Sequence, residues 1–270
     1  RALQGAVPRR RGASGPPALA DVPGALRGDW QRVLAGPVAE TPFDPAMTDG
    51  LPDPVARWLR RALPAGEPLR TAVTLRQHGT IRLRGRWWPF RAVQALDPFR
   101  GYVWPVRTRV LGLPLVGHDS LVGDEARMRH RLLGVLPVVD ASGPDLARSA
   151  AARAVSEMCF VPAAALDPRV TWSPVSEAEA VGTVEVLGHR HELTVRVDAE
   201  GRLLRGTMPR WASVDGGPWQ LHPFGAVCAE EWTVDGVTVP RVVVGGYGAG
   251  ESFHTDGAFI RLVVDAAAYR

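Results

Sequence analysis

One long helical pattern stands in the middle of a sequence that otherwise alternates like β-strands. It spans Ser142–Pro162, where Ser142 or Asp145 can cap the helix, Pro144 suits its first turn and Pro162 ends it. Its apolar stripe recurs every four positions, at Leu146, Ala150, Ala154 and Met158. A single helix flanked by strands on both sides must bury this stripe against a sheet.

From Thr71 onwards, apolar residues recur with a period of two, which indicates strands with one buried face. In the first meander, Trp88, Phe90, Ala92 and Gln94 share one side. Asp235-Gly236, between two β-branched runs, is typical of a hairpin turn. The segments add up to about ten strands. Because no βαβ alternation is present, we expect a mainly antiparallel sheet, curved or partly closed as a barrel, packed around the central helix.

The N-terminal part divides into an arm and a helix. Residues 1–42 are rich in Pro, Gly, Ala and Arg, which favours a poorly ordered arm with one short helical candidate at Gly28–Leu34. Asp53–Leu63 is amphipathic, begins with a capping Asp and a Pro, and predicts an N-terminal helix. We therefore expect residues 43–270 to form a single α+β domain.

The positive charge comes entirely from arginine, because the chain contains no lysine. This composition is most simply that of a GC-rich genome, and it excludes any mechanism that needs a lysine Schiff base. The net charge is +4, and the arginines are scattered along the chain. This distribution weakly favours anionic ligands, and it does not indicate a protein that binds nucleic acid. The glycine-rich run 245–250 lacks the lysine of a phosphate loop, and His189 and His191 have no third ligand nearby. We therefore predict no metal and no cofactor.

Cys159 and Cys228 lie in apolar surroundings at no metal-binding spacing. Two buried free thiols in a reducing compartment are the first expectation, and one disulfide is the alternative.

No apolar run is long enough to span a membrane, and no signal peptide is evident. We therefore expect a cytoplasmic protein. Contact with a membrane surface, the oligomeric state and an upstream segment before Arg1 stay open.

Several polar and aromatic residues fall on faces that should be buried. Trp88 and Trp104 lie on the apolar faces of neighbouring strands, where they either pack in the core or line a ligand pocket. Asp119 follows a turn, so it is either a turn cap or a carboxylate facing the same interior as Glu157. Arg153 and Glu157, four residues apart on the helix, either pair with each other or point at a third group.

These residues also form a combined pattern. It consists of Arg76-Gln77-x-Gly79, Trp88-Pro89-Phe90 with Gln94, Trp104, Asp119 with Gly123 and Met128, Arg153-x-x-x-Glu157, Pro162 and Trp172. The pattern resembles an uncharacterised bacterial domain-of-unknown-function family, from about Phe43 to the C-terminus. The resemblance implies one domain and a shared polar set of Arg76, Gln77, Asp119, Arg153 and Glu157. The chain departs from the family at Ala154-Val155-Ser156 and Phe160, which reshapes the neighbourhood of Glu157.

Three functions are compatible with this sequence. The first is binding of a hydrophobic, partly anionic small molecule or lipid in a tryptophan-lined cavity. The second is a metal-independent acid–base enzyme, such as a cyclase, isomerase or hydrolase of bacterial secondary metabolism, acting on a hydrophobic substrate. The third is a structural domain in which Arg153 and Glu157 tie helix to sheet. The candidate catalytic residues are Asp119, Glu157 and Arg153. The candidate ligand-binding residues are Arg76, Gln77, Trp88, Gln94, Trp104 and Trp172.

Overall fold

The computed structural model describes residues 15–36 and 41–270. Its α-helices are α1 (Arg27–Leu34), α2 (Asp53–Ala62) and α3 (Pro144–Ser156). Short 3-10 helices are η1 (Leu19–Asp21), η2 (Gly24–Leu26), η3 (Pro45–Thr48), η4 (Glu157–Phe160), η5 (Pro162–Leu166) and η6 (Ser252–His254). The strands are β1 (Val73–Leu83), β2 (Arg86–Asp97), β3 (Gly101–Val110), β4 (Leu113–Val122), β5 (Glu125–Leu132), β6 (Leu136–Ser142), β7 (Thr171–Pro174), β8 (Glu179–Val186), β9 (His189–Val197), β10 (Leu203–Ala212), β11 (Gln220–Val234), β12 (Val237–Tyr247) and β13 (Ala258–Tyr269).

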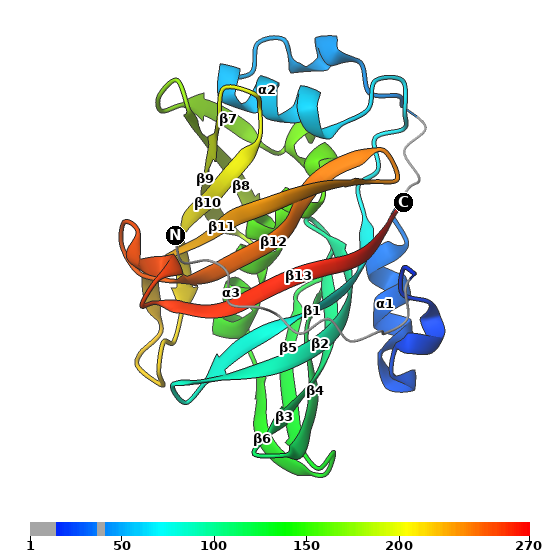
Figure 1. Cartoon of the computed structure of the whole chain (residues 1–270), viewed down its shortest axis with the longest axis vertical. Helices are drawn as coiled ribbons and strands as arrows, with labels where there is room; N and C mark the ends of the chain where they lie inside the picture. Colours follow the sequence, from blue (N-terminus) through cyan, green and yellow to red (C-terminus); the bar gives the residue numbers. More distant parts are fainter. Residues whose placement is uncertain (1–14, 37–40) are drawn as a thin grey trace.

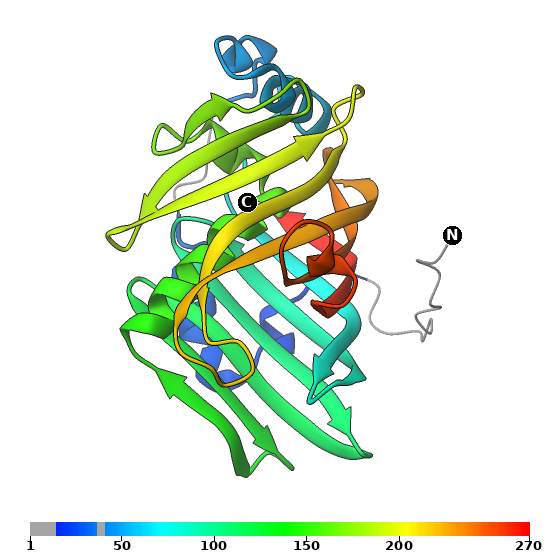
Figure 2. The same cartoon turned by 90° about the vertical axis from the view of Figure 1, so that its left-hand side faces the viewer.

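All thirteen strands belong to one sheet, in the order β6-β5-β4-β3-β2-β1-β13-β12-β11-β10-β9-β8-β7, and every pairing is antiparallel (Figure 1). The chain builds outward from β1 to the edge strand β6. It then crosses through α3 to the opposite edge at β7 and returns, strand by strand, to pair β13 with β1. In Figure 2, α3 passes between the two halves of the sheet. The central helix is therefore the connection between the two edges.

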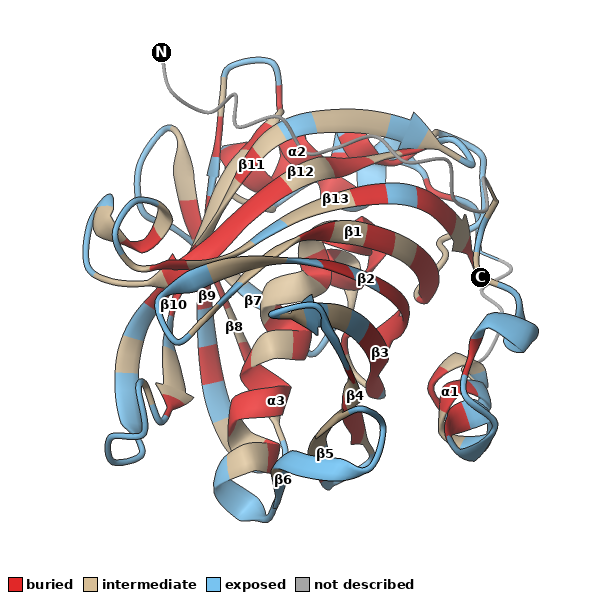
Figure 3. Cartoon of the chain, turned by 60° about the horizontal axis from the view of Figure 1, so that its bottom comes forward, coloured by how far each residue is buried: buried red, intermediate tan, exposed pale blue. Residues whose placement is uncertain are grey.

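The sheet curves around α3, and its two faces are covered differently (Figure 3). On the inner face, α3 and α2 share the main core with the strands; Ala151, Ala154 and Leu59 are almost completely buried there. On the outer face, the N-terminal segment packs against the backs of β2 and β3. The inner face is the one that can hold a site enclosed by both helix and sheet.

The mainly antiparallel sheet is confirmed, but it has thirteen strands where we expected about ten. The sequence prediction missed the exposed edge strand β6 and the short edge strand β7, because neither strand shows a clear apolar alternation. The α-helical part of the central helix begins at Pro144 and ends at Ser156, and Glu157 opens the 3-10 turn η4. Gly79 lies inside β1, where a Cβ would lie 1.9 Å from the Arg261 carbonyl oxygen of β13, so glycine permits the close approach of the two strands.

The expected poorly ordered arm is wrong for residues 15–36. Val22, Leu26, Trp30 and Val33 recur at helical spacing and bury against Val93, Ala95 and Val103 on the outer face of the sheet. Residues 1–14 and 37–40 of the expected arm lie outside the described residues. In the described ranges 15–36 and 41–270, no helix combines the length and apolarity needed to cross a bilayer.

Candidate functional site

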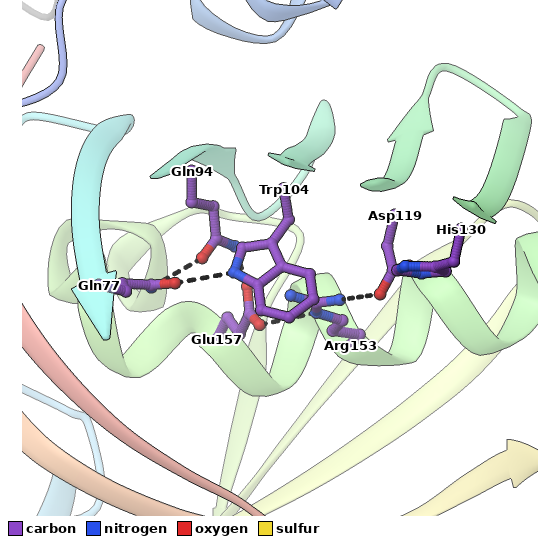
Figure 4. A network of polar contacts seen from close by, with 7 residues as sticks. All are labelled: Gln77, Gln94, Trp104, Asp119, His130, Arg153 and Glu157. Atoms are coloured by element: carbon purple, nitrogen blue, oxygen red, sulfur yellow. Dashed lines mark hydrogen bonds and ion pairs between the residues drawn. The ribbon is translucent and has the colours of Figure 1, made fainter. Parts of the chain in front are cut away.

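Four neighbouring strands each place one polar or aromatic side chain on the inner face, directly opposite α3 (Figure 4). These residues are Gln77 on β1, Gln94 on β2, Trp104 on β3 and Asp119 on β4. The register explains the alignment, because Trp104 pairs directly with Asp119, and Gln77 and Gln94 lie two residues apart on adjacent strands. The row therefore follows from strand alternation, and it meets Arg153 and Glu157 from the helix.

Hydrogen bonds join these side chains into one chain. The Trp104 indole Nε1 donates to Gln77 Oε1 at 2.8 Å, and Gln77 Nε2 donates to Gln94 Oε1 at 2.9 Å. Gln94 Nε2 in turn donates to Glu157 Oε2. Gln77, Gln94 and Trp104 are 1–4% exposed, so each of these bonds satisfies a group that has no access to water.

Arg153 is the centre of the ionic half of this network. Its Nε donates to Glu157 Oε1 at 2.8 Å, and its Nη1 donates to Asp119 Oδ2 at 3.0 Å. The guanidinium carbon also lies 4.4 Å from the ring centroid of Tyr102 and 4.8 Å from that of Trp104. One arginine thus pairs with two carboxylates and two aromatic faces at once.

His130 on β5 completes the network. Its Nε2 lies 2.8 Å from Asp119 Oδ1, so Asp119 has a cationic or polar partner on each carboxylate oxygen. We did not single out His130 or Tyr102 from the sequence. Strand alternation could have found His130, because it lies on the same face of β5 as Met128, the direct partner of Asp119.

The surroundings fix the charges of these groups. Burial alone would raise the pKa of Asp119, but the hydrogen bond with His130 and the charge of Arg153 outweigh burial and lower that pKa. Burial would likewise lower the pKa of Arg153, but Glu157, Tyr102 and Asp119 outweigh it and raise that pKa. Burial raises the pKa of Tyr102 to about 12. At neutral pH, Asp119 is therefore ionised, Arg153 is charged and Tyr102 is neutral.

Three of the predicted ligand-binding residues lie elsewhere. Arg76 points to the outer face, where it pairs with Asp21 at 2.8 Å, because it alternates with Gln77 along β1. Trp88 is on the inner face but partly exposed near the beginning of β2. Trp172 lies on the edge strand β7, where it packs against Trp58 and donates to the Ala165 carbonyl oxygen at 2.9 Å.

A large open hollow of about 480 Å³ lies at the beginning of α3. Three segments line it: the turn into β5, the first turn of α3 and the turn between β8 and β9. The lining residues are Asp124, Glu125, Ala126, Arg127, Ser142, Gly143, Pro144, Ala147, Arg148, Leu187 and His189. No tryptophan and no member of the Arg153 network is among them.

The hollow and the Arg153 network nevertheless share one interface, that of α3 with β4 and β5. Ala147 borders the hollow, and Arg153 follows six residues later on the same helix, which is about 9 Å along its axis. Ala126 borders the hollow on β5, and His130 lies four residues further along that strand. The hollow therefore lies at the surface end of the interface between α3 and the sheet, and the Arg153 network lies at the inner end of the same interface.

The fold and the site define an α+β protein with one open antiparallel sheet, curved around a helix whose Arg153 forms an ion pair with Asp119 of the sheet. The chain belongs to the family of unknown function DUF6544, whose sequence model matches residues 41–255. This assignment confirms the resemblance to a domain-of-unknown-function family. No curated protein matches the chain in sequence.

Solved structures with a similar arrangement are distant in sequence. A LolA superfamily protein from Nitrosomonas europaea is 9% identical with a TM-score of 0.45, covering 80% of this chain and 92% of that chain. A DUF1329 family protein from Desulfovibrio piger is 9% identical with a TM-score of 0.37, covering 90% of this chain and 92% of that chain. Identities and TM-scores this low give no basis for assigning a ligand to this chain.

Proposed function

We propose that the protein binds a small amphipathic molecule with an acidic group, and that the hollow at the beginning of α3 is its binding site. The observation that carries this proposal is the hollow itself. Its volume of about 480 Å³ lies in the range typical of small-molecule sites, roughly 300–1,000 Å³. This refines the binding function predicted from the sequence but moves the site away from Trp88 and Trp104.

The lining supports an amphipathic ligand. Ala126 and Ala147 are buried members of the main core, so the floor of the hollow is apolar, and the exposed Leu187 adds an apolar wall. Small alanine side chains on both β5 and α3 leave space that larger residues would fill. The apolar part of a ligand fits against this floor.

The cationic side of the hollow is formed by Arg127 and Arg148, and His189 lines the hollow as well. The Arg148 guanidinium carbon lies 4.1 Å from the Trp211 ring centroid, which holds that side chain in place. No carboxylate within the described residues forms an ion pair with Arg127 or Arg148, although Asp124 and Glu125 lie at the rim. Two arginines are therefore available to an acidic ligand group.

The geometry gives less support to acid–base catalysis by Asp119 and Glu157. A general acid needs a carboxyl group that is protonated near neutral pH, whereas the pKa of Asp119 is lowered. Arg153 also occupies one oxygen of each carboxylate. We propose instead that this network anchors α3 to strands β4 and β5. It thereby keeps α3 and β5, which both line the hollow, in place.

Fluorescence titration tests the binding function. We expect 11-(dansylamino)undecanoic acid to bind with increased dansyl emission, and dodecanoic acid to displace it at least about tenfold better than dodecanol, because a hydrogen bond to a charged group contributes about 1.5–3 kcal/mol. Ala147→Phe, which fills the hollow, should abolish binding. Arg148→Met should weaken the acid without weakening the alcohol.

The matched control is Arg60→Met, an exposed arginine on α2, which should bind the probe as the unmodified protein does. Circular dichroism of each variant checks that it is folded. Unchanged binding by a folded Ala147→Phe variant would contradict the hollow as the site. Equal displacement by acid and alcohol would contradict the role of the arginines.

A further inference from the structure

Six aliphatic side chains are exposed together at the end of the sheet that lies farthest from α2. They belong to the turn between β3 and β4, to the turn between β5 and β6, and to the first residues of β6. These segments form the lower end of the molecule in Figure 1. Their exposed fractions are Leu111 74%, Leu113 45%, Leu133 49%, Val135 66%, Leu136 54% and Val138 53%. We call these six residues the apolar tip.

The two turns lie side by side. The Leu133 amide donates to the Pro114 carbonyl oxygen at 2.7 Å, and Leu115 pairs directly with Leu132. Both turns point toward the viewer in Figure 3 and are coloured as exposed. The apolar tip is therefore one contiguous surface at the ends of two hairpins. Contiguous exposed apolar surface of this kind marks an interaction site.

The backbone at the apolar tip makes two of the leucines more unusual. Leu111 has φ +52° and is followed by Gly112 at φ +84°, and Leu133 has φ +56° and is followed by Gly134 at φ +74°. Turns with positive φ at both central residues favour Asn or Asp before the Gly, as Asp235-Gly236 shows in this same chain. A leucine at this position is conformationally costly, and Leu187-Gly188 between β8 and β9 forms the same kind of turn. The apolar tip differs in that its two leucines are more exposed to water, 74% and 49% against 38% for Leu187.

The charges behind the apolar tip are mainly positive. Residues 105–118 and 128–139, which form the ends of β3, β4, β5 and β6, contain four arginines. Arg129 forms an ion pair with Asp140 at 3.2 Å, whereas Arg107, Arg109 and Arg131 form none within the described residues. Arg107 and Arg131 both pair with Val116, and Arg109 precedes Leu111 by two residues. At about 3.3 Å per strand residue, these arginines lie roughly 7–13 Å behind Leu111.

We propose that the apolar tip docks on an anionic lipid surface, with its leucines and valines among the acyl chains and its arginines at the headgroups. The apolar faces of interfacial helices enter a bilayer by roughly 5–10 Å, and Arg109, about 7 Å behind Leu111 along the strand, falls within this depth. Arginines that no carboxylate pairs, here Arg107, Arg109 and Arg131, complement the negative potential of such a surface. This proposal does not depend on the hollow or its ligand.

Vesicle co-sedimentation tests the proposal. We expect the whole chain to sediment with large unilamellar vesicles of equal parts phosphatidylcholine and phosphatidylglycerol, much less with phosphatidylcholine alone, and less again in 0.5 M NaCl because salt screens the arginines. The variant is Leu111→Asn together with Leu133→Asn. Asn suits the positive φ at both positions, so the variant should fold at least as well while binding the vesicles about tenfold less.

The matched control is Val175→Asn, which replaces an aliphatic residue of 57% exposure after the edge strand β7, away from the apolar tip, and should bind normally. Equal binding to both kinds of vesicle, or undiminished binding by the double Asn variant, would overturn the proposal. So would a chain that ignores the vesicles but self-associates in analytical ultracentrifugation through Leu111 and Leu133, because the occupant of the apolar tip would then be a second copy.

Discussion

Arg153 Nη1 lies 3.0 Å from Asp119 Oδ2, and this ion pair joins the crossing helix α3 to strand β4 in the middle of the sheet. The two side chains are 15% and 12% exposed. Such a pair contributes little when both charges are present, because their desolvation opposes their attraction. Removing one partner is different, because it leaves the other charge buried without compensation.

Arg153→Met should therefore lower the free energy of unfolding by about 3 kcal/mol or more, since both Asp119 and Glu157 lose their cationic partner. Urea denaturation at pH 7 measures this change. Arg148→Met, which removes an arginine from the same helix at the hollow, is the matched control and should change stability by less than about 1 kcal/mol. A stability of Arg153→Met close to that of the unmodified protein would show that the network does not anchor α3.

Trp104→Phe tests the neutral half of the network. The change leaves Gln77 Oε1 without its indole donor in a place that water does not reach, so we expect a loss of about 1–3 kcal/mol in the free energy of unfolding. Trp219→Phe, at a site that is 37% exposed, is the control and should cost less than about 0.5 kcal/mol. Equal losses in the two variants would mean that the Trp104–Gln77 hydrogen bond is not important for stability.

Strand alternation was enough to predict most of the inner face of the sheet. It placed Trp104 and Gln94 on buried faces, because a period of two carries that information directly. The same alternation puts Arg76 on the opposite face of β1 from Gln77, where the structure places it, so only the family-like pattern made Arg76 a candidate for the same site. His130 was equally accessible to that rule.

The hollow and the crossing of α3 from edge to edge were not predictable in the same way. They depend on which strands are neighbours, and sequence periodicity does not determine the order of strands in a sheet. Strand β7 is four residues long, and β6 is largely exposed, so neither edge has the apolar alternation on which prediction relies. The edges nevertheless decide where α3 begins, and so where the hollow lies.

His191 on β9 should make the protein less stable in acid. It is 5% exposed, and burial lowers its pKa from the ordinary 6.5 to about 4. Between these two pH values the unfolded chain binds a proton that the folded protein does not, so stability falls as the pH decreases from 6.5 to 4. At about 1.4 kcal/mol for each pKa unit, the loss from this residue is about 3 kcal/mol.

His191→Leu should remove this part of the acid sensitivity. Urea denaturation at pH 7 and pH 4.5 gives the change in unfolding free energy for each protein, and the change should be smaller for the variant by about 2–3 kcal/mol. Measurements at pH 7 and pH 8 provide the internal control, because His191 is mostly neutral in both states there and the two proteins should respond almost alike. An identical acid response in both proteins would contradict a neutral, buried His191.

Cys159 and Cys228 should be unreactive in the folded protein. Both are free thiols in the structure, as we first expected from their apolar surroundings. Burial raises the pKa of Cys228 to about 12 and that of Cys159 well above its ordinary value. Because the thiolate is the reactive form, we expect slow reaction with Ellman's reagent at pH 8 in the native state and rapid release of two equivalents in guanidinium without reductant. Rapid native reaction would show that the thiols are accessible, and no release in guanidinium would show that the two cysteines form a disulfide.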